Sequence, residues 1–593
     1  MKVCAARSWL HPLLLSLWTG VGLILRFTYL TDKPLWTDEF STIVFGLGNS
    51  FQTIPLDQNL TLEQLLQPLQ PNPQAGIGAV IHHLLTESNH PPLYFVLTHL
   101  WLMLFPSPDG WVSVWGVRSL SALFGVASIP AAFGLGHFAF RSLVVGQIAA
   151  ALMAVSPFGI YLAQEARHYT LPILWIIASL TCLIAAARTI RDRTPLAFGI
   201  CIAWVLVNVL GIATHYFVIL TLMAEAIVIT AIGLIQSWQE QGRWYPSSHW
   251  WRLWAVAGGT IAGGVSWLPF LPDLQGSPLT QWIQRDGRSG LEWLDPIAHI
   301  IASCVSMIYL LPIQAVSQGV AIASGIVLIF LILWTIPKLI WGWSVQCQNR
   351  DRRLSIMVLS SVVLSAICLF VVSTYVLDRD LTIAFRYHFV YFPAVIILIG
   401  AALASSWEKI PKPSNSASSS ARLSWLYTGG KKTVLAIGLL SLIGGLTVIS
   451  NLGYQKTHRP DVVVQAIQQE AAENLAQGLE ENILVAIAHQ THGQTGRLMG
   501  IAWQMRHDQT HSSTDLVPNP QFLLVHLSEH PQSPIKTLRR SLNRAPRPLA
   551  LWLVNFQDAP DDSLDMLLNR QKCSPETHPE SVDGYRYRLY RCK

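Results

Sequence analysis

Four short polar clusters in an otherwise apolar chain carry the residue types that could do chemistry. The first, Trp36-Thr37-Asp38-Glu39, follows a long apolar segment, where a carboxylate costs desolvation free energy unless it has a chemical task or a cation to meet. The other three are Asn89-His90-Pro91-Pro92-Leu93-Tyr94, then Tyr161 to Tyr169 with Glu165, Arg167 and His168, and finally Arg386-Tyr387-His388. Carboxylates can accept protons, and arginine or histidine can hold anions, so these clusters are candidates for acid–base and anion-binding chemistry.

Each cluster taken alone also has a purely structural explanation. Asp38 and Glu39 could solvate the end of a helix, and Arg386 could extend along apolar surface to reach water. Glu165 and Arg167 could form a surface ion pair of little consequence. A functional interpretation therefore depends on whether the elements of the chain bring the four clusters to one face.

The composition shows that these elements lie in a membrane. The chain has 593 residues, of which 51% are hydrophobic and only 12% are charged. Soluble domains carry roughly 25% charged residues, so the polar surface here is too small to cover a globule of this size. The 23 tryptophans and 15 tyrosines fit aromatic belts at the two membrane interfaces. The net charge of +6 comes from basic residues in short loops, which argues for topology signals and against nucleic-acid binding.

Eleven apolar segments are long enough to cross a bilayer. A span needs about 20 residues for a hydrocarbon thickness of ~30 Å. The candidates are 10–30, 118–139, 142–162, 169–188, 196–214, 217–236, 253–272, 319–341, 354–377, 386–406 and 433–453. Two further stretches, 91–105 and 297–312, are shorter and are interrupted by proline or polar residues. The start of the chain resembles a signal peptide but has no small-residue cleavage site, so we expect a retained first helix.

Basic loops set the expected orientation, because Lys and Arg concentrate on the cytoplasmic side. They are Lys2 and Arg7, then Arg188 to Arg193, Arg243 and Arg252, Arg350 to Arg353, and the linker 410–432. They share one side only if 91–105 and 297–312 do not span. We therefore predict eleven spans plus two interfacial or re-entrant helices, with the N-terminus in the cytoplasm and the region 454–593 outside it. All four polar clusters then lie on the outer face, the first two in the loop 31–117.

The character of the chain changes after residue 453. Strand-length apolar runs (ILVAIA, QFLLVHL, LALWLVNF and YRYRLY) alternate with helix-like segments, which predicts a soluble α/β domain at 454–593 with a largely parallel sheet. It contains no nucleotide-binding motif, and the histidines of HQTHG lack a third metal ligand at a useful spacing. Cys573 and Cys592 fall in this polar region and could pair if it lies outside the cytosol. The other cysteines read as small buried hydrophobic residues.

The motifs resemble those of the GT-C glycosyltransferases of the family 39 type, which include protein O-mannosyltransferases and lipid A aminoarabinose transferases. The similar pieces are the acidic pair Asp38-Glu39, HPPLY, SPFGIYLAQEARHYTL and RYHFVYFP. They cover roughly residues 20–190 and 380–400, whereas between 195 and 380 the likeness is only in hydropathy. HPPLY and QEARHY together are quite specific, and the acidic pair alone is not.

This resemblance implies a GT-C fold at 1–453 and an enzyme of the plasma membrane. Such an enzyme passes a hexosyl or pentosyl group from a polyprenyl-phosphate donor to a hydroxyl acceptor of the cell envelope, outside the cytoplasm and with inversion. The phosphate leaving group needs cations, for which the resemblance points to Arg386, with His90, Arg167, His168, Tyr169 and Tyr387 as further substrate-binding candidates. Asp38 is the first choice for the base, Glu39 the second, and Glu165 matches a further functional acid. Some relatives use a divalent metal, which these three acids could ligate, although we predict no metal site.

A transporter or flippase for lipid-linked glycans is the alternative from another class, because transporters also place discontinuous helices beside polar clusters. The charged groups of transporters tend to lie at mid-membrane, whereas the four polar clusters of this chain gather at one face. This difference favours the enzyme. A catalytically silent scaffold is a third possibility. Trp36, Trp282 and Trp293 could stack on sugar or belong to the aromatic belts. The sugar, the acceptor and the oligomeric state have no signature in the sequence.

Overall fold

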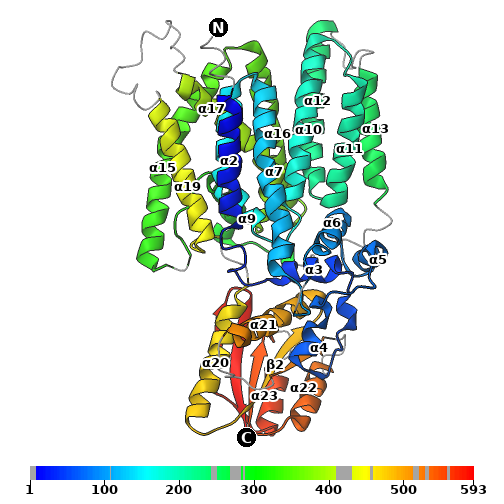
Figure 1. Ribbon diagram of the computed structural model, residues 1–593, viewed down its shortest axis with the longest axis vertical. Coiled ribbons are helices and arrows are strands. Elements are labelled where there is room, and N and C mark those ends of the chain that lie inside the picture. The colour runs from blue at the N-terminus through cyan, green and yellow to red at the C-terminus, as the bar shows by residue number, and fades with distance from the viewer. Residues whose placement is uncertain are drawn as a thin grey trace.

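The computed structural model describes all residues except 1–8, 107–108, 242–249, 268–281, 285–286, 315, 409–429, 455–457, 512–519, 528–532 and 557–560. Two layers are seen in Figure 1: a bundle of long helices that holds the N-terminal end, and a smaller sheet-containing part that holds the C-terminus. Short helices of the loop 31–117 lie between them. The basic residues Arg243, Lys409, Lys412 and Arg422 lie outside the described part of the chain.

Each of the eleven predicted spans contains a helix. They are α2 (Leu10–Phe27), α7 (Val114–Phe140), α8 (Leu143–Val155) with α9 (Pro157–Ala163), α10 (Thr170–Asp192), α11 (Phe198–Thr214), α12 (Val218–Gln241), α13 (Trp251–Val265), α15 (Gln318–Gln346), α16 (Arg350–Tyr375), α17 (Phe392–Glu408) and α19 (Lys431–Ile449). Seven are long and apolar enough by themselves, and α8 with α9 makes an eighth candidate. The predicted class, a polytopic helical membrane protein with a C-terminal α/β domain, is confirmed.

The two short stretches form helices that are too short to cross hydrocarbon. They are α6 (Leu93–Leu102) and α14 (Asp295–Ser306), of 10 and 12 residues. At 1.5 Å per residue they reach roughly 15–18 Å, against ~30 Å for the membrane interior. Two further short helices, α3 (Thr37–Gly46) and α5 (Ile77–Glu87), belong to the same outer loop as α6.

The bend between α8 and α9 brings the third polar cluster to the end of the bundle. The two helices meet at 56° around Ser156, whose hydroxyl accepts from the N–H of Gly159 at the start of α9. Arg26, fully buried in α2, donates to the carbonyls of Met153 (2.9 Å) and Ala154 (2.9 Å). These carbonyls end α8 without intrahelical partners, and a cation there also suits the helix dipole.

The C-terminal part is a mixed sheet with the strand order β1-β3-β2-β4-β7-β5, with β6 beside β7. Its strands are β1 (Asn59–Leu60), β2 (Asn482–His489), β3 (Gln521–His526), β4 (Leu549–Val554), β5 (Cys573–Pro575), β6 (Glu580–Val582) and β7 (Tyr585–Cys592). The four predicted strands are present. The sheet is mixed, however, and not largely parallel as expected. The pairs β2–β3 and β2–β4 are parallel, whereas β7 runs antiparallel to β4, β5 and β6. Two residues join β6 to β7, and such a short connection allows only antiparallel pairing.

Each face of this sheet packs on a different set of helices. Alternate side chains of a strand point to opposite faces, so Val485 and Ile487 join one core and Leu484 and Ala486 another. The second core is closed by α22 (Ser533–Arg544) and α23 (Asp561–Arg570). The first contains α20 (Pro460–Ala476), α21 (His492–His511) and the outer loop, including α3 and α4 (Leu62–Leu66).

The outer loop also supplies a strand. In β1, Asn59 and Leu60 pair antiparallel with Leu523 and Phe522 of β3. The α/β unit is therefore assembled from the segment after residue 453 and from part of the loop 31–117.

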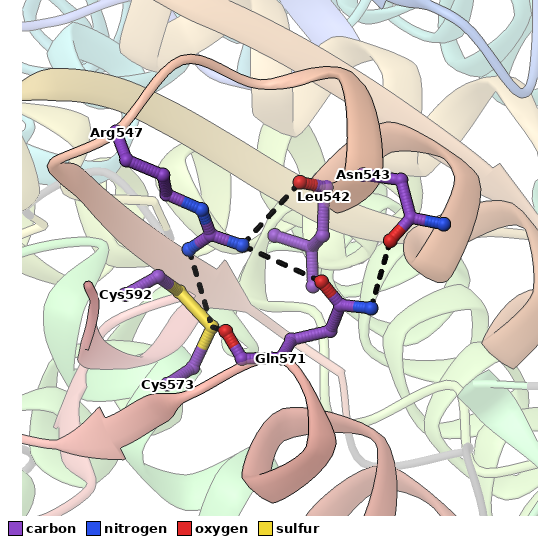
Figure 2. Close-up of a disulfide and its surroundings, with 6 residues drawn as sticks. All are labelled: Leu542, Asn543, Arg547, Gln571, Cys573 and Cys592. Atoms are coloured by element: carbon purple, nitrogen blue, oxygen red, sulfur yellow. Dashed lines mark hydrogen bonds between the residues drawn. A yellow bond between two sulfur atoms is a disulfide. The ribbon is translucent and has the colours of Figure 1, made fainter.

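Cys573 and Cys592 form a disulfide that joins β5 to β7, as Figure 2 shows. The guanidinium of Arg547 lies beside it and donates to the Leu542 carbonyl (3.4 Å) and to Gln571 Oε1 (3.5 Å). Gln571 in turn donates to Asn543 Oδ1 at the end of α22 (2.8 Å). The disulfide thus ties the last strand of the chain to a hydrogen-bonded corner of the sheet.

Candidate active site

The first acidic pair opens helix α3, and its two members have different surroundings. Trp36 is the extended N-cap residue, so Asp38 and Glu39 stand in the first turn, where the helix dipole favours negative charge. The Glu39 side chain is fully buried, whereas the Asp38 side chain is 30% exposed. The Asp38 carboxylate therefore stays partly accessible while its neighbour points into the protein.

Glu39 is held by a buried arginine. Arg118, in the first turns of α7, donates from Nε to Oε1 (2.8 Å) and from a terminal nitrogen to Oε2 (2.9 Å). The backbone N–H of Ala166 donates to Oε1 as well (2.8 Å). Arg118 also donates to the carbonyls of Leu30 and Lys33, both at 2.9 Å. This bidentate pair ties α3 to α7 and to the Glu165 turn, which is an architectural task.

Asp38 lies between the arginines of two other predicted clusters. Its Oδ2 is 3.7 Å from a terminal nitrogen of Arg167 and 3.6 Å from one of Arg386. Burial raises the pKa of the carboxyl group, but the two arginines outweigh it, so the pKa lies below its usual value. Both distances exceed the 2.7–2.9 Å that is typical of charge-assisted hydrogen bonds, so the arginines keep capacity for another anion.

Arg386 is enclosed by aromatic rings. It precedes α17, in the 3-10 helix η7 (Phe385–Val390). Its guanidinium carbon lies 4.9 Å from the centre of the Trp36 ring, 5.6 Å from that of Trp282 and 5.4 Å from that of Tyr387. Cation–π contacts of this kind hold the planar group in one orientation without neutralising its charge. Trp293, by contrast, stacks on Tyr375 (5.7 Å between ring centres).

Arg167 is positioned by the outer loop. One terminal nitrogen donates to the Asp38 carbonyl (2.9 Å) and to Thr42 Oγ1 (3.2 Å), and the other contacts His90 Nε2 (3.1 Å). Burial, followed by the nearby Arg167 charge, lowers the pKa of His90 to about 3. His90 is therefore neutral at physiological pH and, with Nδ1 beside Ser88 Oγ (3.0 Å), orients Arg167 rather than supplying a charge.

His168, Tyr169 and Glu165 are buried behind this front. The His168 ring lies tilted against Tyr169 (4.7 Å between ring centres) and edge-on to His215 (4.4 Å), and burial together with His215 keeps its pKa well below the usual value. Tyr169 also lies under the Arg167 guanidinium (5.7 Å). Glu165 is 2% exposed, and its charge acts on Tyr169. Tyr387 packs edge-on against Phe217 (4.5 Å). All nine predicted site residues thus gather at one end of the bundle.

The C-terminal unit adds residues that the sequence reasoning missed. His458 Nδ1 contacts the backbone nitrogen (3.3 Å) and Oγ1 (2.9 Å) of Thr37. His492, at the start of α21, stacks on Phe51 (5.1 Å). Arg497, one turn further, is close enough to Asp38 for their charges to interact. The only sequence signal was HQTHG itself, which ends one turn before Arg497 and was assessed only for metal.

No group of three or more metal-ligating side chains is found in the described part of the chain. Of the three predicted acids, Glu39 points toward Arg118 and Asp38 faces two other arginines, so these two carboxylates do not converge on one point. The donor set around Asp38 is cationic, which does not fit a divalent metal.

No protein-family model and no curated protein matches the chain. Among solved structures, ArnT from Cupriavidus metallidurans bound to undecaprenyl phosphate is similar with a TM-score of 0.47 and 14% identity, over 97% of both chains. ArnT in the apo state is similar with a TM-score of 0.48 and 14% identity, over 99% of this chain and 98% of the ArnT chain. Arabinofuranosyltransferase AftD from Mycobacteria is similar with a TM-score of 0.40 and 13% identity, over 98% of this chain and 40% of the AftD chain. Both neighbours are GT-C glycosyltransferases, the class that the motifs resemble. At these TM-scores the activity has to be argued from the residues.

Proposed function

We propose that this chain is an inverting membrane glycosyltransferase that moves a sugar from a polyprenyl-phosphate donor to a hydroxyl acceptor of the cell envelope. The observation that carries the proposal is the position of Asp38, a partly exposed carboxylate between two arginines that are themselves almost fully buried. A carboxylate can accept a proton, and arginines at this distance can hold a phosphate that gains charge as it leaves.

The chemistry balances with these groups alone. The acceptor hydroxyl gives its proton to an Asp38 oxygen and forms the new bond to the anomeric carbon. The bond from that carbon to the phosphate oxygen breaks on the opposite side, and its electron pair leaves with the phosphate. Arg386 and Arg167 stabilise this leaving group, and the aromatic rings around Arg386 keep its guanidinium in place.

The remaining predicted residues support Asp38 and the two arginines in different ways. Glu39 positions α3 through Arg118, so we assign it a structural task instead of the second-choice base. His90 orients Arg167 as a neutral ring. The buried Glu165, His168 and Tyr169 form a wall behind the arginines, to which the half-buried Tyr387 adds. This wall is the surface against which a sugar bound at Arg386 would rest.

We further propose that the site faces the extracytoplasmic side of the plasma membrane. The Cys573–Cys592 disulfide supports this orientation, because such bonds form and persist in oxidising compartments. The basic residues support it too, since α7 and α10 begin beside the site and Arg188, near the end of α10, donates to the Ala139 carbonyl near the end of α7.

Transfer of radiolabel from a polyprenyl-phosphate hexose to envelope extract tests the proposal on purified protein. Wild type should transfer label, and Asp38→Asn should lose transfer while it still binds the donor, because Arg386 and Arg167 stay in place. Arg386→Gln should instead weaken donor binding. Undiminished transfer by Asp38→Asn would refute the assigned base. Movement of labelled lipid between leaflets without transfer would favour the flippase.

A further inference from the structure

Helix α21 of the C-terminal unit lies directly on the turn that carries Asp38. A Cβ atom built on Gly496 would stand 3.0 Å from Thr37 Cγ2 and 3.3 Å from Thr37 Cα, so a larger residue would require Thr37 to shift by a few tenths of an ångström. One turn on, a Cβ on Gly500 would stand 3.6 Å from Phe40. Residues four apart share one helix face, so α21 presents this glycine face to α3. Arg497 follows Gly496 directly.

Arg497 is a half-buried cation whose guanidinium makes no hydrogen bond or ion pair with the residues that the structure describes. Its charge interacts with Asp38 and Tyr585, and burial lowers its pKa from the usual value. A half-buried guanidinium without a hydrogen-bonded partner keeps its N–H donors available to an anion that reaches the site.

Two histidines of the C-terminal unit, His458 and His492, are uncharged, unlike Arg497. Burial, followed by the Arg497 charge, lowers the pKa of His458 to about 3, and burial lowers that of His492 to about 4. Both rings are therefore neutral near pH 7 and can offer hydrogen bonds only. Arg497 is thus a cation held close to the catalytic carboxylate by the C-terminal unit, whereas Arg167 and Arg386 come from the helix bundle.

Geometry assigns the two sets of cations to different substrates. In an inverting displacement the acceptor approaches the anomeric carbon opposite the leaving phosphate. The bundle arginines, 3.6 and 3.7 Å from Asp38, suit the donor phosphate. An acceptor would then approach Asp38 from the side on which Arg497 lies. We infer that Arg497 is an acceptor-binding residue and that the acceptor carries an acidic group, a phosphate or a carboxylate, next to the hydroxyl that is glycosylated. This inference rests on the proposed function.

The test measures acceptor and donor kinetics separately, with envelope extract as the acceptor. Arg497→Gln should raise the apparent KM for the extract about tenfold or more, since charge-assisted hydrogen bonds are lost, and leave the donor KM within about twofold. Arg497→Lys, which keeps the charge, should recover part of the loss. Arg540→Gln is a matched control, because Arg540 is an exposed arginine on α22.

Three small competitors identify the acidic group: glycerol, glycerate and glycerol 3-phosphate, at constant ionic strength and saturating donor. At least one of the two acids should compete with the extract in wild type and fail to do so in Arg497→Gln, and the one that competes names the group. An equal rise of the donor KM in Arg497→Gln, or an unchanged extract KM, would overturn the inference while leaving the transferase intact.

Calorimetric titration of donor-loaded protein with the same three compounds gives a readout that does not need turnover. Binding of an acid that depends on Arg497 would support the anion site even if no label were transferred, in which case only the proposed function would fail. Absence of acid binding to wild type would overturn the inference.

Discussion

At the scale of single residues, adjacent acids with the same sequence signal have opposite surroundings. Asp38 is 30% exposed and faces Arg167 and Arg386, whereas Glu39 is fully buried on Arg118. The motif and the resemblance were enough to select Asp38 first and to nominate Arg386. They could not identify Arg118 as the partner of Glu39, because 79 residues separate the two in sequence and only the packing of α3 on α7 brings them together.

The buried pair gives a stability prediction. Arg118→Leu leaves the Glu39 carboxylate buried without its cation, which should destabilise the protein by about 3–5 kcal/mol. The double variant Glu39→Leu/Arg118→Leu should be less destabilised than Arg118→Leu alone, because no charge is left unpaired. Thermal unfolding in one detergent at a fixed scan rate measures both.

Glu39→Gln separates architecture from catalysis. It should lower the unfolding temperature, since the Arg118 charge loses its counter-ion, yet keep most of kcat well below that temperature. A kcat loss as deep as that of Asp38→Asn, with an unchanged unfolding temperature, would mean that Glu39 acts in the chemistry.

The pH dependence of transfer should report the arginines around Asp38. Burial raises the pKa of this carboxyl group, but Arg167 and Arg386 bring it below the usual value of about 3.9. Its ion pairs therefore stabilise the fold at all pH values above about 4, and this contribution is lost as pH falls through the lower folded-state pKa. A donor phosphate that occupies the arginines removes part of this effect, so the Asp38 pKa should rise in the donor complex.

Two rate profiles measure that shift. The profile of kcat/KM for the donor reflects the free enzyme, and that of kcat at saturating donor reflects the complex. We expect the acid limb of kcat to lie at the higher pH. Coincident limbs would show that the donor phosphate does not engage the arginines that face Asp38.

At the scale of elements, the spans could be predicted because hydropathy and length are properties of a local window. The short helices α6 and α14 were also predicted, since the basic loops share one side of the membrane only if neither stretch crosses it. The antiparallel half of the sheet was not, because the pairing of β7 depends on partners that are distant in sequence. The strand β1 was missed for a simpler reason: two residues are too few for a period-2 pattern.

The contact between α3 and α21 gives a prediction at this scale. Replacing a helical glycine by alanine usually stabilises a helix, by up to about 1 kcal/mol. At Gly496 a Cβ would press on Thr37, including its backbone Cα at 3.3 Å, so the clash should outweigh the gain. Gly496→Ala should therefore lower both transfer and the unfolding temperature.

The control for the Gly496 variant has to be a glycine with ordinary backbone angles. Gly478 does not qualify, because its φ is positive at 75°. Gly438→Ala in α19 is the matched control, since nothing lies within 4 Å of a Cβ there. It should leave transfer unchanged. Equal behaviour of the two variants would show that α21 and α3 do not need their close approach.

At the scale of the whole molecule, the two layers of Figure 1 share a core. One cluster of buried side chains contains Phe40, Ile43 and Leu65 of the outer loop together with Val485, Ile487 and Phe522 of the sheet. The loop thus covers one face of the sheet and supplies its edge strand, while α22 and α23 cover the other. The composition suggests a domain boundary at residue 454, and this boundary stays a prediction. The shared core contains residues from both sides of it.

A truncation tests how far the layers depend on each other. A chain ending at residue 453 would expose the apolar side chains that α3 and α4 bury against the sheet, and a contiguous apolar patch of this kind promotes aggregation. It would also lose the Thr37 contacts to His458 and the support of α21 next to Asp38. We therefore expect 1–453 to aggregate in a detergent that keeps the full chain monodisperse, and to lose photolabelling by a polyprenyl-phosphate donor analogue as well as transfer. The double variant Cys573→Ser/Cys592→Ser serves as the control, because it alters the same unit but leaves the shared core covered, and it should keep donor labelling. A monodisperse 1–453 that labels like wild type would show that the helix bundle builds the donor site without the C-terminal unit, and would confine that unit to the acceptor.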